Sequence, residues 1–188
     1  MSHPRGFAVA LVEFDIAKAH PDFRREIPDI LLPLTKCYPG ARLQSVELYT
    51  PKPGDTSMGA TYPGGRIRLN RYWFDRDPEH LRKAAMHHAV IEVGGVPMGW
   101  HGPMVWEPRQ LLTHEFGHVV WQCLPQQVIE QWANDRWCAA TREPYRSPGG
   151  YALTDPEEFF GEMFALVHLG FATADEAADL RGLTARLQ

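Results

Sequence analysis

The segment HEFGH, residues 114–118, places three ionisable side chains inside a stretch that is otherwise strongly apolar. Proline suits the first turn of a helix and also ends helices, so Pro108 and Pro125 bound a predicted helix over residues 108–123. A helix that is apolar nearly all round is buried, and buried polar groups need partners. We therefore expect a buried helix, in which the two histidines and the glutamate need a polar partner such as a metal ion.

The spacing inside this segment is typical of a metal site. His114 and His118 are four residues apart, so on a helix they share a face, with Cβ atoms about 5–6 Å apart. Both imidazoles can then reach one Zn²⁺ at about 2.0–2.1 Å. Glu115 lies about 100° further round the axis, where it can take a proton from a metal-bound water. We predict two ligands and the general base of a zinc hydrolase; the competing interpretation is an exposed helix that needs no metal.

A second helix is expected to supply a third ligand, because a catalytic zinc usually has three protein ligands and one open position. The segment over residues 154–170 begins with Thr154 or Asp155 as a possible N-cap and Pro156 in the first turn. Its apolar surface is broken by glutamates. A helix here would bring carboxylates toward the histidines of the first helix.

Glu158 and Glu162 are four residues apart and share one face of this second helix. We expect Glu158 to be the third ligand and Glu162 to accept the free N–H of a zinc-bound histidine. Glu157 is the alternative ligand. Without a metal, Glu158 would be a first-turn carboxylate favoured by the helix dipole, and Glu162 a solvated surface group.

The pattern Y-x₆-E-F-F-x-E follows HEFGH by about forty residues, as Tyr151, Glu158, Phe159, Phe160 and Glu162. Together the two motifs resemble the lethal-factor-like zinc metallopeptidases, a family of the gluzincin group. The resemblance is clear over residues 108–170 and only general upstream, where residues 57–72 look like the strand pair that precedes the active-site helix in such enzymes.

This resemblance implies an α+β, zincin-like metallopeptidase domain in which a small mixed sheet packs on the active-site helix and further helices. It implies Zn²⁺ held by His114, His118 and Glu158, with Glu115 as the base. Tyr151 would donate a hydrogen bond to the developing oxyanion. The substrate would be a peptide or protein; its identity, its cleavage preference and its biological setting do not carry over.

Chain length and net charge limit the number of domains and the kinds of partner that we expect. At 188 residues we expect one domain over 1–188, with strands and helices over 1–106 and the zinc-ligand helices over 107–188. A net charge of −4 gives no field for nucleic acid or an anionic membrane. No apolar run nears the length of a membrane span, and no signal peptide is read. We expect a cytoplasmic protein, with delivery to another cell or a virion left open, as is the oligomeric state.

Three functions remain open from the residues themselves. The first is a zinc-dependent endopeptidase. The second is a non-catalytic zincin-fold protein with a structural or partner-binding role, for example in a virion or assembly. The third is a zinc hydrolase of non-peptide amides. Glu115 and Tyr151 favour an enzyme, because a structural zinc site needs neither and usually has four protein ligands.

The rest of the chain alternates between strand and helix signals. Residues 42–50 predict a strand, and MGATY and RIRLN a hairpin joined by Pro63-Gly64-Gly65, one edge of which could pair with an extended peptide. The expected helices are pieces over 22–37 interrupted at Pro28 and Pro33, one from Asp77-Pro78 to Gly94-Gly95, one over 126–142 and a short one within 173–188, with a loop over 94–107.

Overall fold

The computed structural model of the chain describes residues 11–81, 91–93, 96–98, 108–142 and 151–188, with the backbone alone at 91–93, 96–98 and Tyr151. The strands are β1 (Glu13–Asp15), β2 (Ser45–Tyr49), β3 (Gly59–Tyr62), β4 (Arg66–Asn70), β5 (Ile91–Val93) and β6 (Val96–Met98). The helices are α1 (Pro21–Cys37), α2 (Arg71–Phe74), α4 (Pro108–Trp121), α5 (Gln126–Trp132), the π-helix η1 (Ala133–Trp137), α6 (Cys138–Arg142), the 3₁₀-helix η3 (Tyr151–Leu153), α7 (Pro156–Leu169) and α8 (Ala174–Thr184).

The main sheet has four strands in the order β1-β2-β4-β3. Strand β2 runs parallel to both β1 and β4, whereas β3 pairs antiparallel with β4. The expected hairpin is present, and its turn uses two glycines with positive φ, 85° at Gly64 and 72° at Gly65. The prediction of a mixed α+β architecture with a small mixed sheet is therefore confirmed. Strand β3 lies at one edge of this sheet.

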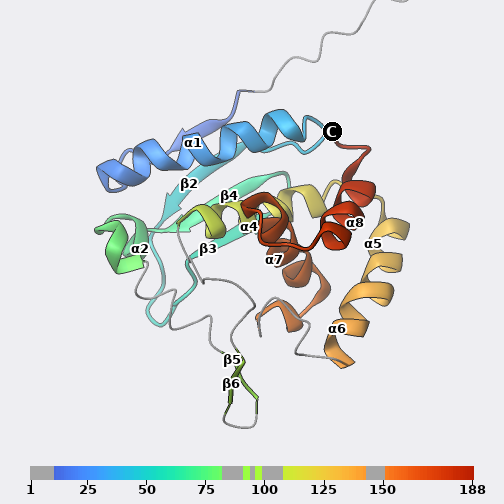
Figure 1. The fold of residues 1–188 in the computed structure, drawn as a ribbon. Helices are drawn as coiled ribbons and strands as arrows, with labels where there is room; N and C mark the ends of the chain where they lie inside the picture. The colour runs from blue at the N-terminus through green and yellow to red at the C-terminus, as the bar shows by residue number, and fades with distance from the viewer. Residues whose placement is uncertain (1–10, 82–90, 94–95, 99–107, 143–150) are drawn as a thin grey trace, which may run out of the picture.

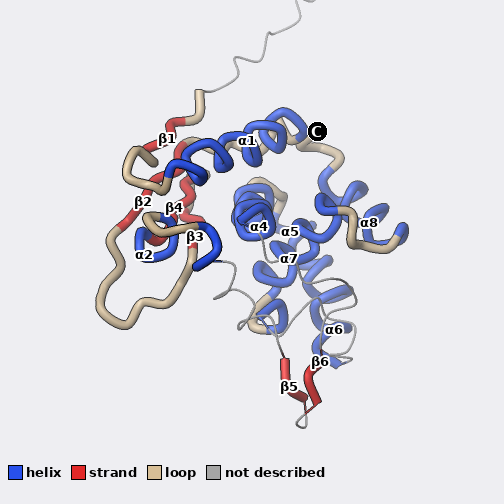
Figure 2. The backbone as a smooth tube through the Cα atoms, turned by 60° about the vertical axis from the view of Figure 1, so that its left-hand side comes forward, coloured by secondary structure: helices blue, strands red, loops and turns tan. Residues whose placement is uncertain are grey.

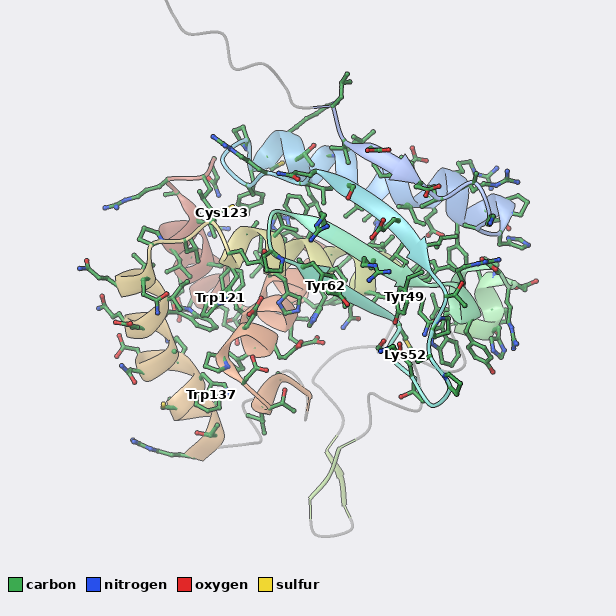
Figure 3. The ribbon with its side chains drawn as sticks, turned by 180° about the vertical axis from the view of Figure 1, so that it is seen from behind. Tyr49, Lys52, Tyr62, Trp121, Cys123 and Trp137 are labelled. Atoms are coloured by element: carbon green, nitrogen blue, oxygen red, sulfur yellow. The ribbon has the colours of Figure 1, made fainter. Side chains whose placement is uncertain are left out.

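Helix α4 occupies the middle of the molecule (Figure 1). Seen end-on in Figure 2, it lies between the main sheet and α7. One face of the sheet is apolar, because Val46, Ile67 and Leu69 are fully buried in the same cluster as α4. Tyr49 and Tyr62, labelled in Figure 3, lie on the sheet, and the Tyr62 side chain is exposed. The core thus forms where the sheet meets α4.

Helix α1 runs without a break from Pro21 to Cys37, so the predicted interruption at Pro28 and Pro33 is wrong. A proline inside a helix removes one backbone hydrogen bond and leaves a carbonyl without its helical partner. These carbonyls belong to Arg24 and Asp29, which are both exposed, so they can face water. The opposite face is buried, and its packing stabilises the helix: Phe23, Ile27, Ile30, Leu31 and Leu34.

The helix expected to run from Asp77 to Gly95 does not extend that far. Residues 91–93 form β5, which pairs antiparallel with β6. Strand β6 in turn lies inside the predicted loop over 94–107. β-Branched residues on both sides of a Gly-Gly pair are a hairpin signal, and this local preference prevails over helix continuation. Residues 82–90 lie outside the described residues. No helix in the described part of the chain has the length and apolarity needed to cross a bilayer.

Candidate metal centre

Helix α4 carries the ionisable side chains of the HEFGH segment into the interior. The exposed fractions of His114, Glu115 and His118 are 5%, 4% and 6%. Every residue of α4 except Arg109 is buried, as the apolar sequence predicts. Burying such groups is costly unless each meets a partner of opposite charge or a metal ion. The groups around these three side chains therefore indicate what helix α4 can bind.

Helix α7 supplies the facing carboxylate. Asp155 starts the helix by accepting hydrogen bonds from the backbone N–H groups of Glu157 and Glu158, which fixes the first turn. From there the Oε2 atom of Glu158 lies 3.1 Å from His114 Nε2 and 3.4 Å from His118 Nε2. The two Nε2 atoms are 2.9 Å apart. Three donor atoms from two helices thus converge on one point.

These distances fit a tetrahedral metal ion. Ligand atoms about 2.0–2.1 Å from Zn²⁺ in a tetrahedral arrangement lie about 3.3 Å from one another, close to the separations among His114, His118 and Glu158. Among the described residues, this trio forms a group of the kind that can hold a metal ion. A proton shared between two of these donor atoms forms one hydrogen bond and leaves the third atom without one. A metal ion at the centre can bind all three atoms at once. The donor set, two imidazoles and a carboxylate, is of the kind that binds transition metals, zinc among them.

The charges around the trio favour a bound cation. Burial lowers the pKa of the His114 imidazole, but the carboxylates of Glu158 and Glu162 outweigh burial and raise this pKa well above its usual range. Burial also lowers the pKa of His118, and Glu157 and Glu158 outweigh it, raising this pKa to about 9. Burial raises the pKa of Glu158, but the two histidines hold it well below its usual range. The site thus has an excess of negative charge.

Glu162 lies behind His114. Its Oε1 atom is 3.2 Å from His114 Nδ1, on the side of the ring away from the converging Nε2 atoms. Its other oxygen accepts a 3.5 Å hydrogen bond from Gln110 Nε2. Glu162 is 4% exposed. A carboxylate in this place fixes the tautomer and orientation of a metal-binding imidazole.

Glu157 occupies the corresponding place behind His118. Its Oε1 atom lies 3.4 Å from His118 Nδ1, and its side chain is 41% exposed. It is therefore on the far side of this ring from the trio, where it does not compete with Glu158 for the metal position. Sequence reasoning treated Glu157 as an alternative ligand. Its part in orienting His118 was missed, because the direction of the His118 ring depends on the packing of α4 against α7.

Glu115 points to β3 rather than into the trio. Its Oε2 atom accepts a 2.7 Å hydrogen bond from Thr61 Oγ1, which also lies 2.9 Å from the Glu115 backbone oxygen. A Cβ atom at Gly59 would lie 3.0 Å from Glu115 Oε1. The carboxylate is near enough to raise the pKa of both His114 and His118. Glu115 therefore lies beside the trio and outside it.

Two glycines allow α4 and α7 to approach closely. A Cβ atom at Gly117 would lie 3.1 Å from the Cα atom of Gly161, and one at Gly161 would lie 2.9 Å from the His114 ring. Any larger residue at either position would push the helices apart or displace the ring. The glycines therefore set how far Glu158 reaches toward the histidines. The sequence shows both glycines but does not show that they face each other.

Tyr151 is described through its backbone alone, as the first residue of η3, and η3 contacts α7. Its hydroxyl group falls outside the description, so the oxyanion role stays a prediction. Thr61 and Gly59 were missed at this site, although a signal existed. Alternation along the hairpin places them on the same side as Ile67 and Leu69, the buried side of the sheet.

Comparisons of this chain with protein-family models, curated proteins and solved structures return no match. The argument for function therefore depends on the geometry of these residues and on their chemistry.

Proposed function

We propose that this chain is a zinc-dependent endopeptidase with a zincin-like domain, similar to the lethal-factor-like peptidases. The observation that carries the proposal is the convergence of His114, His118 and Glu158, with the buried carboxylate of Glu115 beside them. A structural site would have no need of that additional carboxylate. Three ligands also leave a tetrahedral position open, which is the arrangement of catalytic zinc sites.

Each residue then has a defined task. His114, His118 and Glu158 would hold a zinc ion, which would lower the pKa of a bound water toward about 7 and polarise a carbonyl group. Glu115 accepts the proton of the attacking water and returns it to the leaving amine. The Tyr151 hydroxyl donates a hydrogen bond to the oxygen of the scissile carbonyl as negative charge develops on that oxygen.

The position of β3 supports a peptide substrate over a small amide. Strand β3 is the last strand of its sheet, and it touches Glu115 through Thr61. An extended peptide can pair with the backbone of an edge strand, and such pairing would place a peptide bond near the base. A small amide would gain nothing from a strand edge at this place. The proposed substrate is therefore an extended segment of a polypeptide.

Zinc content is the first test. Purified protein should hold one zinc per chain, and Glu158→Ala should lose it or bind it far more weakly. Glu130→Ala is the matched control, because Glu130 is an exposed glutamate on α5 that contacts Gln126. Absence of zinc in the wild-type protein even after zinc addition would reject the proposal. Equal zinc in wild type and Glu158→Ala would reject the ligand assignment.

A peptide-library digest is the second test, because it separates a peptidase from a hydrolase of other amides. The zinc-loaded protein should cleave within peptides, and cleavage should stop in Glu115→Gln. Zinc binding without cleavage of any peptide, in a protein whose fold is intact by circular dichroism, would reject the endopeptidase proposal. It would then favour the non-catalytic role.

A further inference from the structure

We propose that Gly59 and Thr61, here called the β3 pair, hold the Glu115 carboxylate in its working orientation, and that Thr61 is a positioning residue for proton transfer. This inference rests on the proposed function, because it concerns the base of that reaction. It goes beyond the zinc ligands by giving the edge strand a second task. Besides its proposed pairing with substrate, β3 would orient the residue that handles the proton.

The register of the hairpin places both members of the pair toward α4. Gly59 is opposite Leu69 and Thr61 is opposite Ile67. Leu69 and Ile67 are fully buried in the cluster that includes α4. Directly opposed residues in an antiparallel ladder share a face, so the β3 pair belongs to the same buried face of the sheet. Both residues therefore meet α4 from the sheet.

The two residues act on different carboxylate oxygens, one by donating a hydrogen bond and one by leaving space. Thr61 Oγ1 lies 2.7 Å from Glu115 Oε2, a short bond of the kind formed by a hydroxyl and a charged acceptor. Gly59 leaves room for Oε1, since a Cβ atom there would come within 3.0 Å of it. One oxygen is thus held by a donor, while the other has no donor from Thr61 and can accept a proton.

Orientation matters because a base works only at close range. A general base must come within about 2.6–3.2 Å of the proton that it takes, and a 1 Å misplacement can cost about 10²-fold in rate. A glutamate side chain has several rotatable bonds, so burial alone does not fix its carboxylate. The Thr61 hydroxyl supplies the missing restraint across 54 residues of sequence.

The structure also defines the competing arrangement. Thr61 Oγ1 lies 2.9 Å from the backbone oxygen of Glu115, and one hydroxyl has one proton to donate. If the hydroxyl donates to the backbone oxygen, Thr61 stabilises the packing of β3 on α4 and does not orient the carboxylate. The backbone oxygen remains when the side chain of residue 115 is removed, whereas the carboxylate does not. A double-mutant cycle therefore separates the two arrangements.

The cycle uses Thr61→Val in wild-type and Glu115→Ala backgrounds, with zinc in excess and the thermal midpoint Tm as readout. Thr61→Val should lower Tm by roughly 3–10 °C in the wild type and by less than half as much in Glu115→Ala. Thr184→Val is the matched control, because its buried hydroxyl donates to the Leu180 carbonyl within α8. Its effect should be equal in both backgrounds.

Turnover of a peptide found in the library digest completes the test. Thr61→Val should lower kcat about 10–100-fold, with KM and zinc affinity within about twofold, because only transition-state geometry is lost. Thr61→Ser keeps the hydroxyl and should restore kcat. Gly59→Ala should also lower kcat while zinc is retained. Thr184→Val should leave kcat unchanged.

The two readouts test different parts of the proposal: the Tm cycle tests which oxygen accepts the hydrogen bond, and kcat tests whether that bond matters for turnover. Equal Tm losses in the two backgrounds would overturn the proposal, because the hydroxyl would then serve the backbone oxygen. A coupled Tm loss with unchanged kcat would also overturn it, since Thr61 would be a structural tie only. If the wild type cleaves no peptide, the proposed function fails, whereas the Tm cycle still decides whether Thr61 holds the carboxylate.

Discussion

Helices α1 and α4 both pack into the same core, yet they place polar side chains in opposite ways. Helix α1 buries one apolar face and turns its charged residues outward, with Asp22 and Arg25 paired in solvent. Helix α4 is buried almost all round and takes Gln110, His114 and Glu115 inside with it. A charged residue on α1 loses little hydration, whereas one on α4 needs a specific partner.

The difference shows where the chain buries polar groups at a cost in stability. The buried polar groups of α4 are met by groups from α7 and β3: Glu158 and Glu162 at the histidines and Thr61 at Glu115. Hydrophobic residues at those positions would pack with less desolvation cost. Stability alone does not explain such a helix. Substitutions on α4 should accordingly change zinc binding or turnover, whereas substitutions on the exposed face of α1 should cause only small changes in the free energy of unfolding.

The largest effect is expected at Glu115. Glu115→Gln keeps the shape of the side chain but removes the proton acceptor, so peptide turnover should fall about 10²–10⁴-fold while one zinc per chain is retained. Zinc analysis beside initial-rate kinetics checks this. Turnover within a few-fold of wild type would remove Glu115 as the base.

The next effect is expected at Tyr151. Tyr151→Phe removes one hydrogen-bond donor to the developing oxyanion, so kcat should fall by a factor that corresponds to about 2.7–4 kcal/mol. KM and zinc content should stay near wild type. Unchanged kcat in this variant would exclude Tyr151 from the site, and Phe171→Leu, at an exposed position after α7, serves as a control for aromatic substitution.

The zinc-free protein should lose stability as pH rises. The pKa of His118 is raised from 6.5 to about 9 in the folded chain, so its contribution is complete below pH 6.5 and is lost as pH rises through 9. A shift of that size corresponds to about 3 kcal/mol. Urea unfolding with chelator present, from pH 6 to 10, measures the loss. His118→Asn should flatten the curve, and an equally steep curve in that variant would contradict the assignment.

A smaller effect is expected from the carboxylates behind the histidines. Glu162→Gln should weaken zinc binding about 10–100-fold, because Glu162 orients His114. Glu157→Gln should weaken it less, since Glu157 is 41% exposed and lies at the longer distance from its histidine. Competition with a chromogenic chelator measures both variants. A reversed order would mean that solvent exposure does not govern these contacts.

The smallest effect is expected on α1. Arg25→Ala removes an ion pair with Asp22 in which both side chains are largely exposed, so the free energy of unfolding should change by less than about 0.5 kcal/mol. Zinc affinity and turnover should not change. Loss of zinc in this variant would contradict the comparison, because it would show that the exposed face of α1 also affects the zinc site.

Sequence reasoning identified the parts of the site that depend on helical periodicity. The pairs His114 with His118 and Glu158 with Glu162 follow from four-residue spacing, and the helix starts follow from Pro108 and Pro156. The N-cap was left open between Thr154 and Asp155, and the structure uses Asp155. The contact of Thr61 with Glu115 was missed, because it depends on how a hairpin docks on a helix. The continuity of α1 was missed as well, since packing of its apolar face prevails over the local effect of proline.

The contact between Gly117 and Gly161 has a consequence for the proposed metal site. Two helix backbones meet there with no intervening side chain, so no change of rotamer can widen the gap between α4 and α7. The two glycines would thus set how closely a carboxylate of α7 approaches the imidazoles of α4. The choice of ion would follow from the type of ligand, because calcium takes about six to eight oxygen ligands whereas the trio offers two imidazole nitrogens and one carboxylate.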